Sequence, residues 1–243
     1  MIGLSENRII KPASIIVTQD LKTNLSHCWE LNESSGTTLY AAYGTYNQTA
    51  YNAPTVGITA LMDKGVKLSY TSTNYIQATN LSPNWNVFTV NVWYYPITLY
   101  SLCGIALYGK SVSDSYQYLS WQLSVTNSNT YFNICEWTGS AGIPHSCATT
   151  TVSTGAWHMI TGVKTATGIL LYIDGALAAT ATFTYTTRTI SGYYFKQGSS
   201  YARRNPHGII DQTALWANRA LNADEISYLY NSGAGLPYTS WTY

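Results

Sequence analysis

Short stretches of alternating apolar and polar residues recur along most of this sequence, separated by clusters of Gly, Asn, Ser and Pro. The clearest stretches lie at 88–96, 116–125 and 131–137. Successive side chains of a strand point to opposite faces, so each stretch predicts a strand with one buried face and one face of hydroxyl, amide and aromatic groups. Many short strands of this kind predict an all-β fold of stacked antiparallel sheets.

Two local signals fix a turn and a helix within this β pattern. Asp174-Gly175 lies between two apolar runs, which predicts a hairpin with a two-residue type I′ turn. The segment 222–231 predicts the one helix, with Asn222 as N-cap, Glu225 completing a capping box, and Gly233 or Gly235 as the stop. We expect this helix to dock on the sandwich.

The chain divides into an arm and one domain. Residues 1–23 contain the β-branched run Ile15-Ile16-Val17-Thr18 and predict an extended N-terminal arm that attaches to a sheet edge or to a partner. Residues 24–243 are long enough for a single large β domain with its own core.

Charge and hydropathy exclude several classes of protein. The sequence has 12 Lys and Arg against 11 Asp and Glu, a net charge of +1, and Arg203-Arg204 is the nearest thing to a basic patch, so we expect no nucleic-acid binding. The longest apolar runs, such as 169–173, are too short to cross a bilayer, so we expect no membrane insertion. The N-terminus lacks the pattern of a secretory signal.

The four cysteines have no metal-type spacing. Cys28, Cys103, Cys135 and Cys147 allow three complete disulfide pairings, and no C-x-x-C motif occurs. We favour buried thiols over disulfides, because nothing in the sequence marks an oxidising compartment.

Aromatic residues with a polar group are unusually abundant, with 22 Tyr and 8 Trp against 4 Phe. Flat faces with hydrogen-bonding edges suit sugar rings, and side-chain amides complete such sites. The polar strand faces therefore supply the candidate carbohydrate-binding residues Trp93, Tyr95, Tyr118, Gln122, Asn133 and Trp137. The alternative is that loops or a partner subunit cover these aromatic residues, which are also enriched in interfaces.

Catalytic motifs are missing. The sequence has no G-x-S-x-G or H-E-x-x-H motif, and the four histidines are scattered. We expect His158, beside Trp157, to have a structural role. Glycoside hydrolysis needs two carboxylates across the scissile bond, yet Asp174 is assigned to a turn and Asp224 and Glu225 to a helix start. We therefore expect no catalytic residues and no enzyme activity.

Five segments, taken in order, resemble the concanavalin A-like lectin/glucanase superfamily and its laminin-G-like branch. They are 28–39, 88–96, 155–158 followed by 171–175, 208–216, and 219–226, and the resemblance spans about 24–236. It implies a two-sheet antiparallel jelly-roll β-sandwich, with one sheet commonly concave and used for glycans. The glucanases of this superfamily carry Glu-x-Asp-x-Glu on one strand, and no acidic pair at i, i+2 occurs here.

The same resemblance implies calcium as the usual cofactor. Asn32, Glu33 and Asp211 are the candidate ligands for a weak calcium site, since calcium prefers oxygen ligands. The segment 40–44, where relatives often carry an Asp, has no carboxylate, so we expect the chain to work without a cofactor.

Together these features predict a non-catalytic structural or adhesion protein with a lectin-like domain. We expect a phage virion surface component, a head decoration or fibre, whose arm contacts the virion or sister subunits in a homo-oligomer and whose domain binds host or environmental glycans. Its location is then the virion surface, and otherwise extracellular. The alternatives are a glycoside hydrolase, a lectin outside any particle, and a cement protein without a sugar site.

Overall fold

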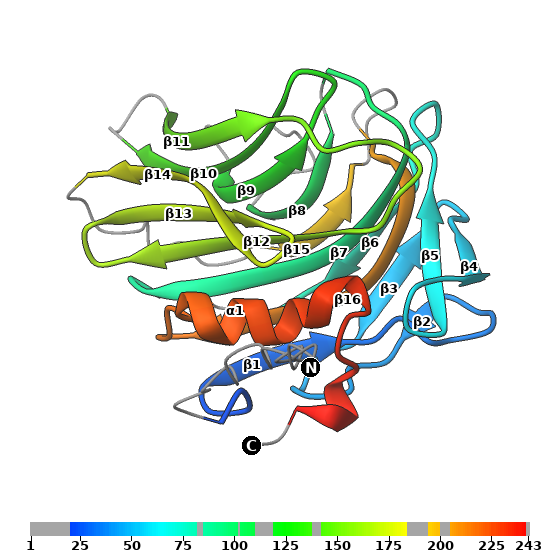
Figure 1. Cartoon of the computed structure of the whole chain (residues 1–243). Helices are drawn as coiled ribbons and strands as arrows, with labels where there is room; N and C mark the ends of the chain where they lie inside the picture. Colours follow the sequence, from blue (N-terminus) through cyan, green and yellow to red (C-terminus); the bar gives the residue numbers. More distant parts are fainter. Residues whose placement is uncertain are drawn as a thin grey trace, which may run out of the picture.

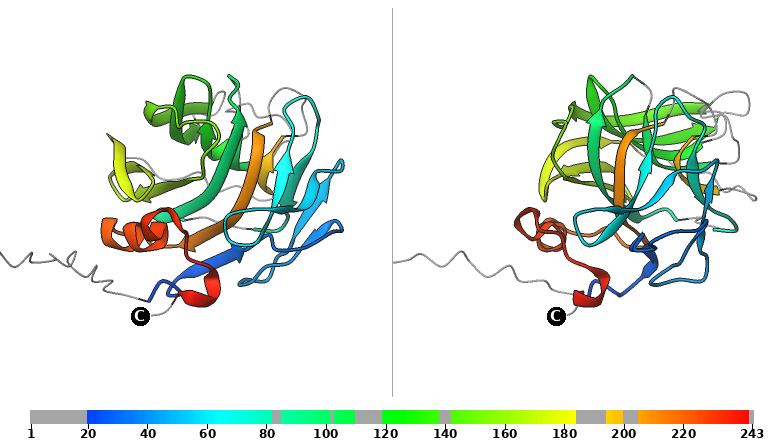
Figure 2. Two further views of the ribbon diagram at one scale, coloured as in Figure 1. Left: turned by 45° about the vertical axis from the view of Figure 1, so that its right-hand side comes forward. Right: turned by 90° about the vertical axis from the view of Figure 1, so that its right-hand side faces the viewer.

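The computed structural model describes residues 20–81, 85–101, 103–109, 119–137, 142–183, 194–199 and 205–241. Most of the predicted arm, 1–19, lies outside the described residues. Two antiparallel sheets face each other, with one helix and the C-terminal segment packed at their base (Figures 1 and 2). The sequence prediction of an all-β sandwich with one short C-terminal helix is confirmed.

The first sheet, sheet A, contains eight strands. Their order is β14 (Ala176–Thr182), β13 (Gly168–Ile173), β12 (His158–Thr165), β7 (Phe88–Thr98), β16 (His207–Ala217), β5 (Lys64–Leu68) and β4 (Thr55–Thr59), with β1 (Leu25–Trp29) paired to β16. The first and last strands of the domain therefore pair with each other, which closes the chain on itself.

The second sheet, sheet B, also contains eight strands. Their order is β11 (Gly142–Thr150), β10 (Asn129–Trp137), β9 (Leu119–Val125), β8 (Gly104–Gly109), β15 (Tyr194–Gly198), β6 (Tyr75–Ala78), β3 (Gln48–Tyr51) and β2 (Thr38–Leu39). The chain crosses between the sheets several times, as in a jelly roll.

The main core lies between the two sheets and uses the predicted apolar faces. Phe88, Val90 and Val92 of β7 meet Leu123 of β9 and Phe132 of β10, all almost fully buried. The Phe88 ring contacts the Phe132 ring edge-on, with centroids 6.1 Å apart. Side chains of both sheets interdigitate in this layer, as expected for sheet-on-sheet packing.

A second apolar layer lies on the outer side of sheet A, beneath helix α1 (Ala223–Tyr230). Ile226 and Leu229 of α1 pack over Trp93 of β7, Met159 of β12 and Trp216 of β16. Figure 1 shows α1 lying along the lower edge of this sheet. This side of sheet A is therefore interior, although β7 alternates like a strand that is exposed on one face.

The helix begins as predicted, and its C-cap is Asn231, two residues before Gly233 and four before Gly235. The Asn222 side chain accepts from the Glu225 amide and Glu225 accepts from the Asn222 amide, which confirms the capping box. At the other end Asn231 takes the left-handed conformation with φ 49°, a C-cap role that Asn shares with Gly. Neither Gly233 nor Gly235 is the cap.

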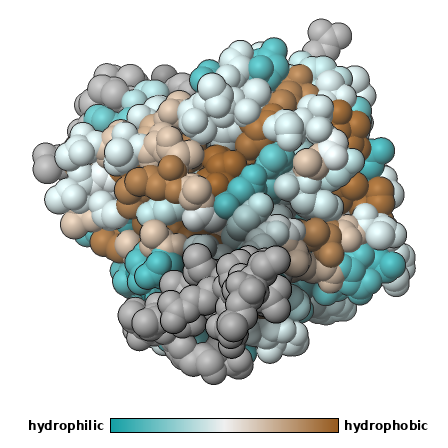
Figure 3. Space-filling view, in the orientation of Figure 1, coloured by the Kyte–Doolittle hydropathy of each residue, from teal (hydrophilic) through white to brown (hydrophobic). Residues whose placement is uncertain are grey.

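The Asp174-Gly175 hairpin is confirmed, because both residues have the positive φ values of a type I′ turn, 52° and 80°. It joins β13 to β14, an edge strand whose side chains are largely exposed; Leu177 is 53% exposed. Apolar residues gather in a broken band across this side of the molecule (Figure 3).

All four cysteines are buried thiols, and none forms a disulfide, as predicted. Burial raises the pKa of Cys135 and of Cys147 to about 12. They therefore pack as small apolar side chains and stay protonated at neutral pH.

Candidate functional site

The predicted carbohydrate-binding residues do not share one surface. Trp93 and Tyr95 lie on β7 in sheet A, whereas Gln122 lies on β9 and Asn133 on β10 in sheet B. Trp137 ends β10, and Tyr118 lies outside the described residues. Among the members of the set that the structure describes, Gln122 and Asn133 are direct partners, opposite each other in the β9–β10 pairing. The candidate set therefore divides between two sheets.

The prediction that Trp93 faces a ligand is wrong. Its side chain is 1% exposed and stacks on Tyr230 of α1, with ring centroids 5.9 Å apart. The C-terminal helix buries its apolar face against this side of sheet A, and Trp93 fills the space beneath it. The strand pattern gives the direction of the side chain but not the element that covers it.

Tyr95 lies further along β7, at the rim of sheet A. Its half-buried ring packs at 5.5 Å against Trp157, in the loop before β12. The same loop is tied to β7 by a hydrogen bond from the Gly155 amide to the Pro96 carbonyl, 2.9 Å. Tyr95 and Trp157 thus form a small aromatic shelf, separate from sheet B.

A hollow of about 270 Å³ lies on the outer face of sheet B, over β10 and β11. Asn133 is paired with Gln122 on one side and with Ser146 on the other. Phe132 and Ile134 alternate with Asn133 and point into the core, so Asn133 points outward. The residues that line the hollow are Asn129, Tyr131, Asn133, Ser146 and Ala148.

Three buried polar atoms in this region have no hydrogen-bond partner in the part of the chain that the structure describes. They are Oδ1 of Asn133 and the hydroxyls of Ser120 and Ser124 on the adjacent strand β9. All three residues are at most 1% exposed. A buried polar group without a partner costs about 1–3 kcal/mol. Of these three residues, Asn133 lines the hollow, whereas Ser120 and Ser124 are not among the residues that line it.

The three candidate calcium ligands accept hydrogen bonds from backbone amides. Asn32 Oδ1 accepts from the Lys64 amide at 3.2 Å, and Glu33 Oε1 accepts from the Tyr40 amide at 2.6 Å. Asp211 accepts from the amides of Met62 and Gln212 at 2.9 and 2.7 Å. Each of these residues thus holds a different loop or strand end, and the weak calcium site stays a prediction. Among the described residues, no group of three His, Cys, Asp or Glu could hold a metal ion.

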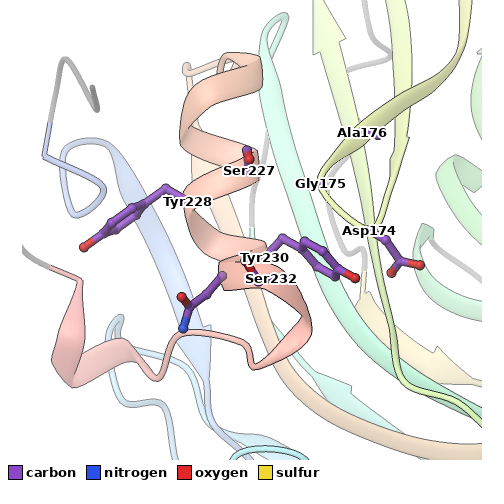
Figure 4. Close-up of a pocket in the computed structure, with 8 residues that line it drawn as sticks. Asp174, Gly175, Ala176, Ser227, Tyr228, Tyr230 and Ser232 are labelled. Atoms are coloured by element: carbon purple, nitrogen blue, oxygen red, sulfur yellow. The ribbon is translucent and has the colours of Figure 1, made fainter. Parts of the chain in front are cut away.

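A larger hollow, about 400 Å³, separates the end of α1 from the β13–β14 turn. Figure 4 shows Tyr230 extending from the helix towards Asp174, while Tyr228 points away to the other side. The lining residues are Asp174, Gly175, Ala176, Ser227, Tyr228, Tyr230, Asn231 and Ser232. Sequence reasoning missed this hollow because its walls come from elements that are distant in sequence. The Asp-Gly turn and the helix cap were both visible, but not their proximity.

The described residues contain no helix with the length and apolar character of a transmembrane span.

Comparison with known proteins places the fold. The family profile described as the concanavalin A-like lectin/glucanases superfamily matches residues 70–227, more than half of the chain. No curated protein sequence matches.

Solved structures agree with this assignment. Domain 4 of AbnA, a GH43 extracellular arabinanase from Geobacillus stearothermophilus in complex with arabinotriose, aligns with a TM-score of 0.60 and 14% identity, over 84% of this chain and 97% of that one. The binding domain of Paraclostridial Mosquitocidal Protein 1 aligns with a TM-score of 0.64 and 17% identity, over 87% of this chain and 52% of that one.

The binding domain of Botulinum Neurotoxin DC in complex with SialylT aligns with a TM-score of 0.65 and 13% identity, over 86% of this chain and 51% of that one. The chain thus spans about half the length of the two toxin binding domains. At sequence identities this low, the alignments show that these structures and this chain share a fold. Together with the family match, they show that the chain belongs to the concanavalin A-like lectin/glucanase superfamily.

Proposed function

We propose that this protein is a carbohydrate-binding protein that holds a neutral glycan in the hollow on the outer face of sheet B. The observation that carries the proposal is Asn133, which lines this hollow and whose buried Oδ1 has no hydrogen-bond partner among the described residues. Sugar hydroxyls donate and accept hydrogen bonds, so a glycan in the hollow would supply a partner for the Asn133 amide.

The chemistry of the hollow favours an uncharged ligand. Its lining residues are two amides, a hydroxyl, a tyrosine and an alanine, none of them charged at neutral pH. The half-buried Tyr131 offers a flat ring next to Asn133. The arabinanase domain with the same fold is described with arabinotriose bound, which supports a glycan as the ligand class.

We propose that binding occurs without cleavage of the glycosidic bond. Hydrolysis of that bond requires two carboxyl groups on either side of it. The described residues that line the hollow include no carboxylate. The glycan would leave the site intact, as in a lectin.

The test is calorimetric titration of the full chain with neutral oligosaccharides, including arabinose oligomers. We expect Asn133→Ala to weaken binding about three- to tenfold, the value of one neutral hydrogen bond. Tyr131→Ala should weaken it further through loss of stacking. Tyr40→Ala is the matched control, because Tyr40 is 63% exposed and lies outside the hollow. It should leave the affinity for the glycan unchanged. Equal affinity in all three variants would contradict the assignment of this hollow.

We also propose that the protein is displayed on a phage virion surface, as a decoration or fibre component, with 1–19 as the attachment segment. The support is compositional: only 9% of residues are charged, and the arm carries a β-branched run. Gradient fractionation of the source lysate should find the protein with large particles. Deleting 1–19 should release the protein from these particles. The deletion leaves Asp20 in place, whose carbonyl accepts a hydrogen bond from Arg219.

A homo-oligomer is part of the same proposal. The exposed edge strand β14 carries no charged residue and no proline, the features that usually protect a sheet edge from pairing. Sedimentation of the full chain should show an oligomer, and Leu177→Lys should shift it towards the monomer. A monomer in the unchanged protein at micromolar concentration would rule out this part of the proposal.

A further inference from the structure

Three side chains at the rim of sheet A form a continuous chain of hydrogen bonds. Ser153 lies in the loop before β12, His158 is the first residue of β12, and Asp174 is in the β13–β14 turn. The Ser153 hydroxyl lies 2.9 Å from His158 Nε2. His158 Nδ1 lies 2.8 Å from Asp174 Oδ2.

The backbone holds the acidic end of this chain in place. The second oxygen of Asp174 accepts from the Met159 amide at 2.9 Å, and the Asp174 amide donates to the Met159 carbonyl at 2.9 Å. The carboxylate cannot donate, so His158 Nδ1 carries the proton in this pair, which leaves Nε2 as the ring nitrogen that can accept from the Ser153 hydroxyl. This is the polarity in which a histidine takes a proton from serine.

The serine end of the chain is open to solvent. Ser153 is exposed, whereas only 12% of the His158 side chain is exposed. Gly155 follows two residues later with φ 75°, and its amide holds the loop against β7. The shelf formed by Tyr95 and Trp157 flanks the same loop. A small molecule could reach the Ser153 oxygen beside an aromatic surface.

We propose that Ser153 is a nucleophile activated through His158 and Asp174, and that it accepts acyl groups from short-chain carboxylic esters, such as O-acetyl groups. This goes beyond the proposed glycan binding, which uses a different sheet and needs no nucleophile. The loop 151–157 has no charged residue, and its open, aromatic setting suits a small neutral acyl group.

The reaction balances with water as the only co-reactant. The Ser153 oxygen attacks the ester carbonyl carbon while its proton passes to His158 Nε2. The ester C–O bond then breaks, and His158 returns the proton to the departing alcohol, leaving acyl-serine. Water attacks the acyl-serine, with its proton passing through His158, and a carboxylic acid leaves. Asp174 positions the imidazole and stabilises its charged form.

The test uses the full chain with a fluorophosphonate probe and with p-nitrophenyl acetate. We expect one probe adduct, on Ser153 by peptide mass spectrometry, and its loss in Ser153→Ala. His158→Gln should reduce ester hydrolysis at least tenfold. Asp174→Asn should reduce it as well while keeping the turn, since Asn also tolerates the positive φ of 52°. Thr154→Ala, in the same loop, is the matched control and should label like the unchanged protein.

Two results would overturn the proposal. One is no adduct on Ser153 under conditions that label a known serine hydrolase. The other is labelling of Ser153 that is the same in His158→Gln and Asp174→Asn as in the unchanged chain. Thermal melting and titration with glycan show whether each variant is still folded. They therefore separate a variant in which Ser153 is no longer activated from one that has lost its fold. If His158→Gln does not fold, Ser153→Ala and Asp174→Asn still decide the outcome.

Discussion

At the scale of single residues, two buried titratable groups respond to pH in opposite directions. Burial raises the pKa of Asp211 from its ordinary 3.8 to about 6, although three backbone amides favour its charged form. Burial lowers the pKa of His27 from its ordinary 6.5 to about 4. Between pH 4 and 6, folded Asp211 holds a proton that the unfolded chain has released, so its contribution to stability falls as pH rises. Folded His27 lacks a proton that the unfolded chain holds, so its contribution rises with pH.

These opposed contributions predict how two variants will differ. Each group changes the free energy of unfolding by about 3 kcal/mol between pH 4 and 6.5, so the two changes largely cancel in the unchanged protein. We expect the free energy of unfolding of Asp211→Asn to rise from pH 4 to 6.5 more steeply than that of the unchanged protein. The free energy of unfolding of His27→Gln should fall over the same range. Urea unfolding at several pH values measures both slopes. Asp63→Asn, whose side chain is 62% exposed, is the control and should leave the slope unchanged. Parallel curves for all variants would show that neither buried group controls the pH dependence.

At the scale of elements, helix α1 is held by a buried ion pair at its first turn. Arg219 Nη2 lies 2.6 Å from Glu225 Oε1, and both side chains are at most 6% exposed. Arg219 also donates to the carbonyls of Asp20 and Thr23, which ties the start of the domain to the start of the helix. Removing one partner leaves the other charge buried and unpaired.

Glu225→Gln should therefore destabilise the whole fold, by about 3 kcal/mol, although it changes one atom. The matched control is Asp224→Asn in the same helical turn, which is exposed and should cost less than about 1 kcal/mol. Chemical denaturation followed by circular dichroism measures both. If the two variants lost the same stability, the pair would not be what anchors the helix.

At the scale of the whole molecule, local signals could be predicted from the sequence and long-range packing could not. Asn222 with Glu225, and Asp174 with Gly175, encode their structures within a few residues, so the cap and the turn were identified. Trp93 and Asn133 have the same strand periodicity, yet one lies beneath α1 and the other faces a hollow. The difference depends on which sheet each strand joins and on where a helix 130 residues later docks, and periodicity contains neither.

Because the two sheets are separate, Trp93 and Asn133, both predicted to bind a glycan, have different roles. Trp93→Ala removes a fully buried ring from beneath α1 and should cost about 3–5 kcal/mol, lowering the melting temperature by about 10 °C. Glycan affinity at 25 °C should not change, because the hollow lies on sheet B. Asn133→Ala should do the opposite, since it weakens glycan binding and relieves a buried polar atom that lacks a partner. Calorimetric melting and titration of both variants measure the two effects together. Loss of glycan binding in Trp93→Ala at temperatures where it is folded would place the ligand on sheet A and contradict the assignment to sheet B.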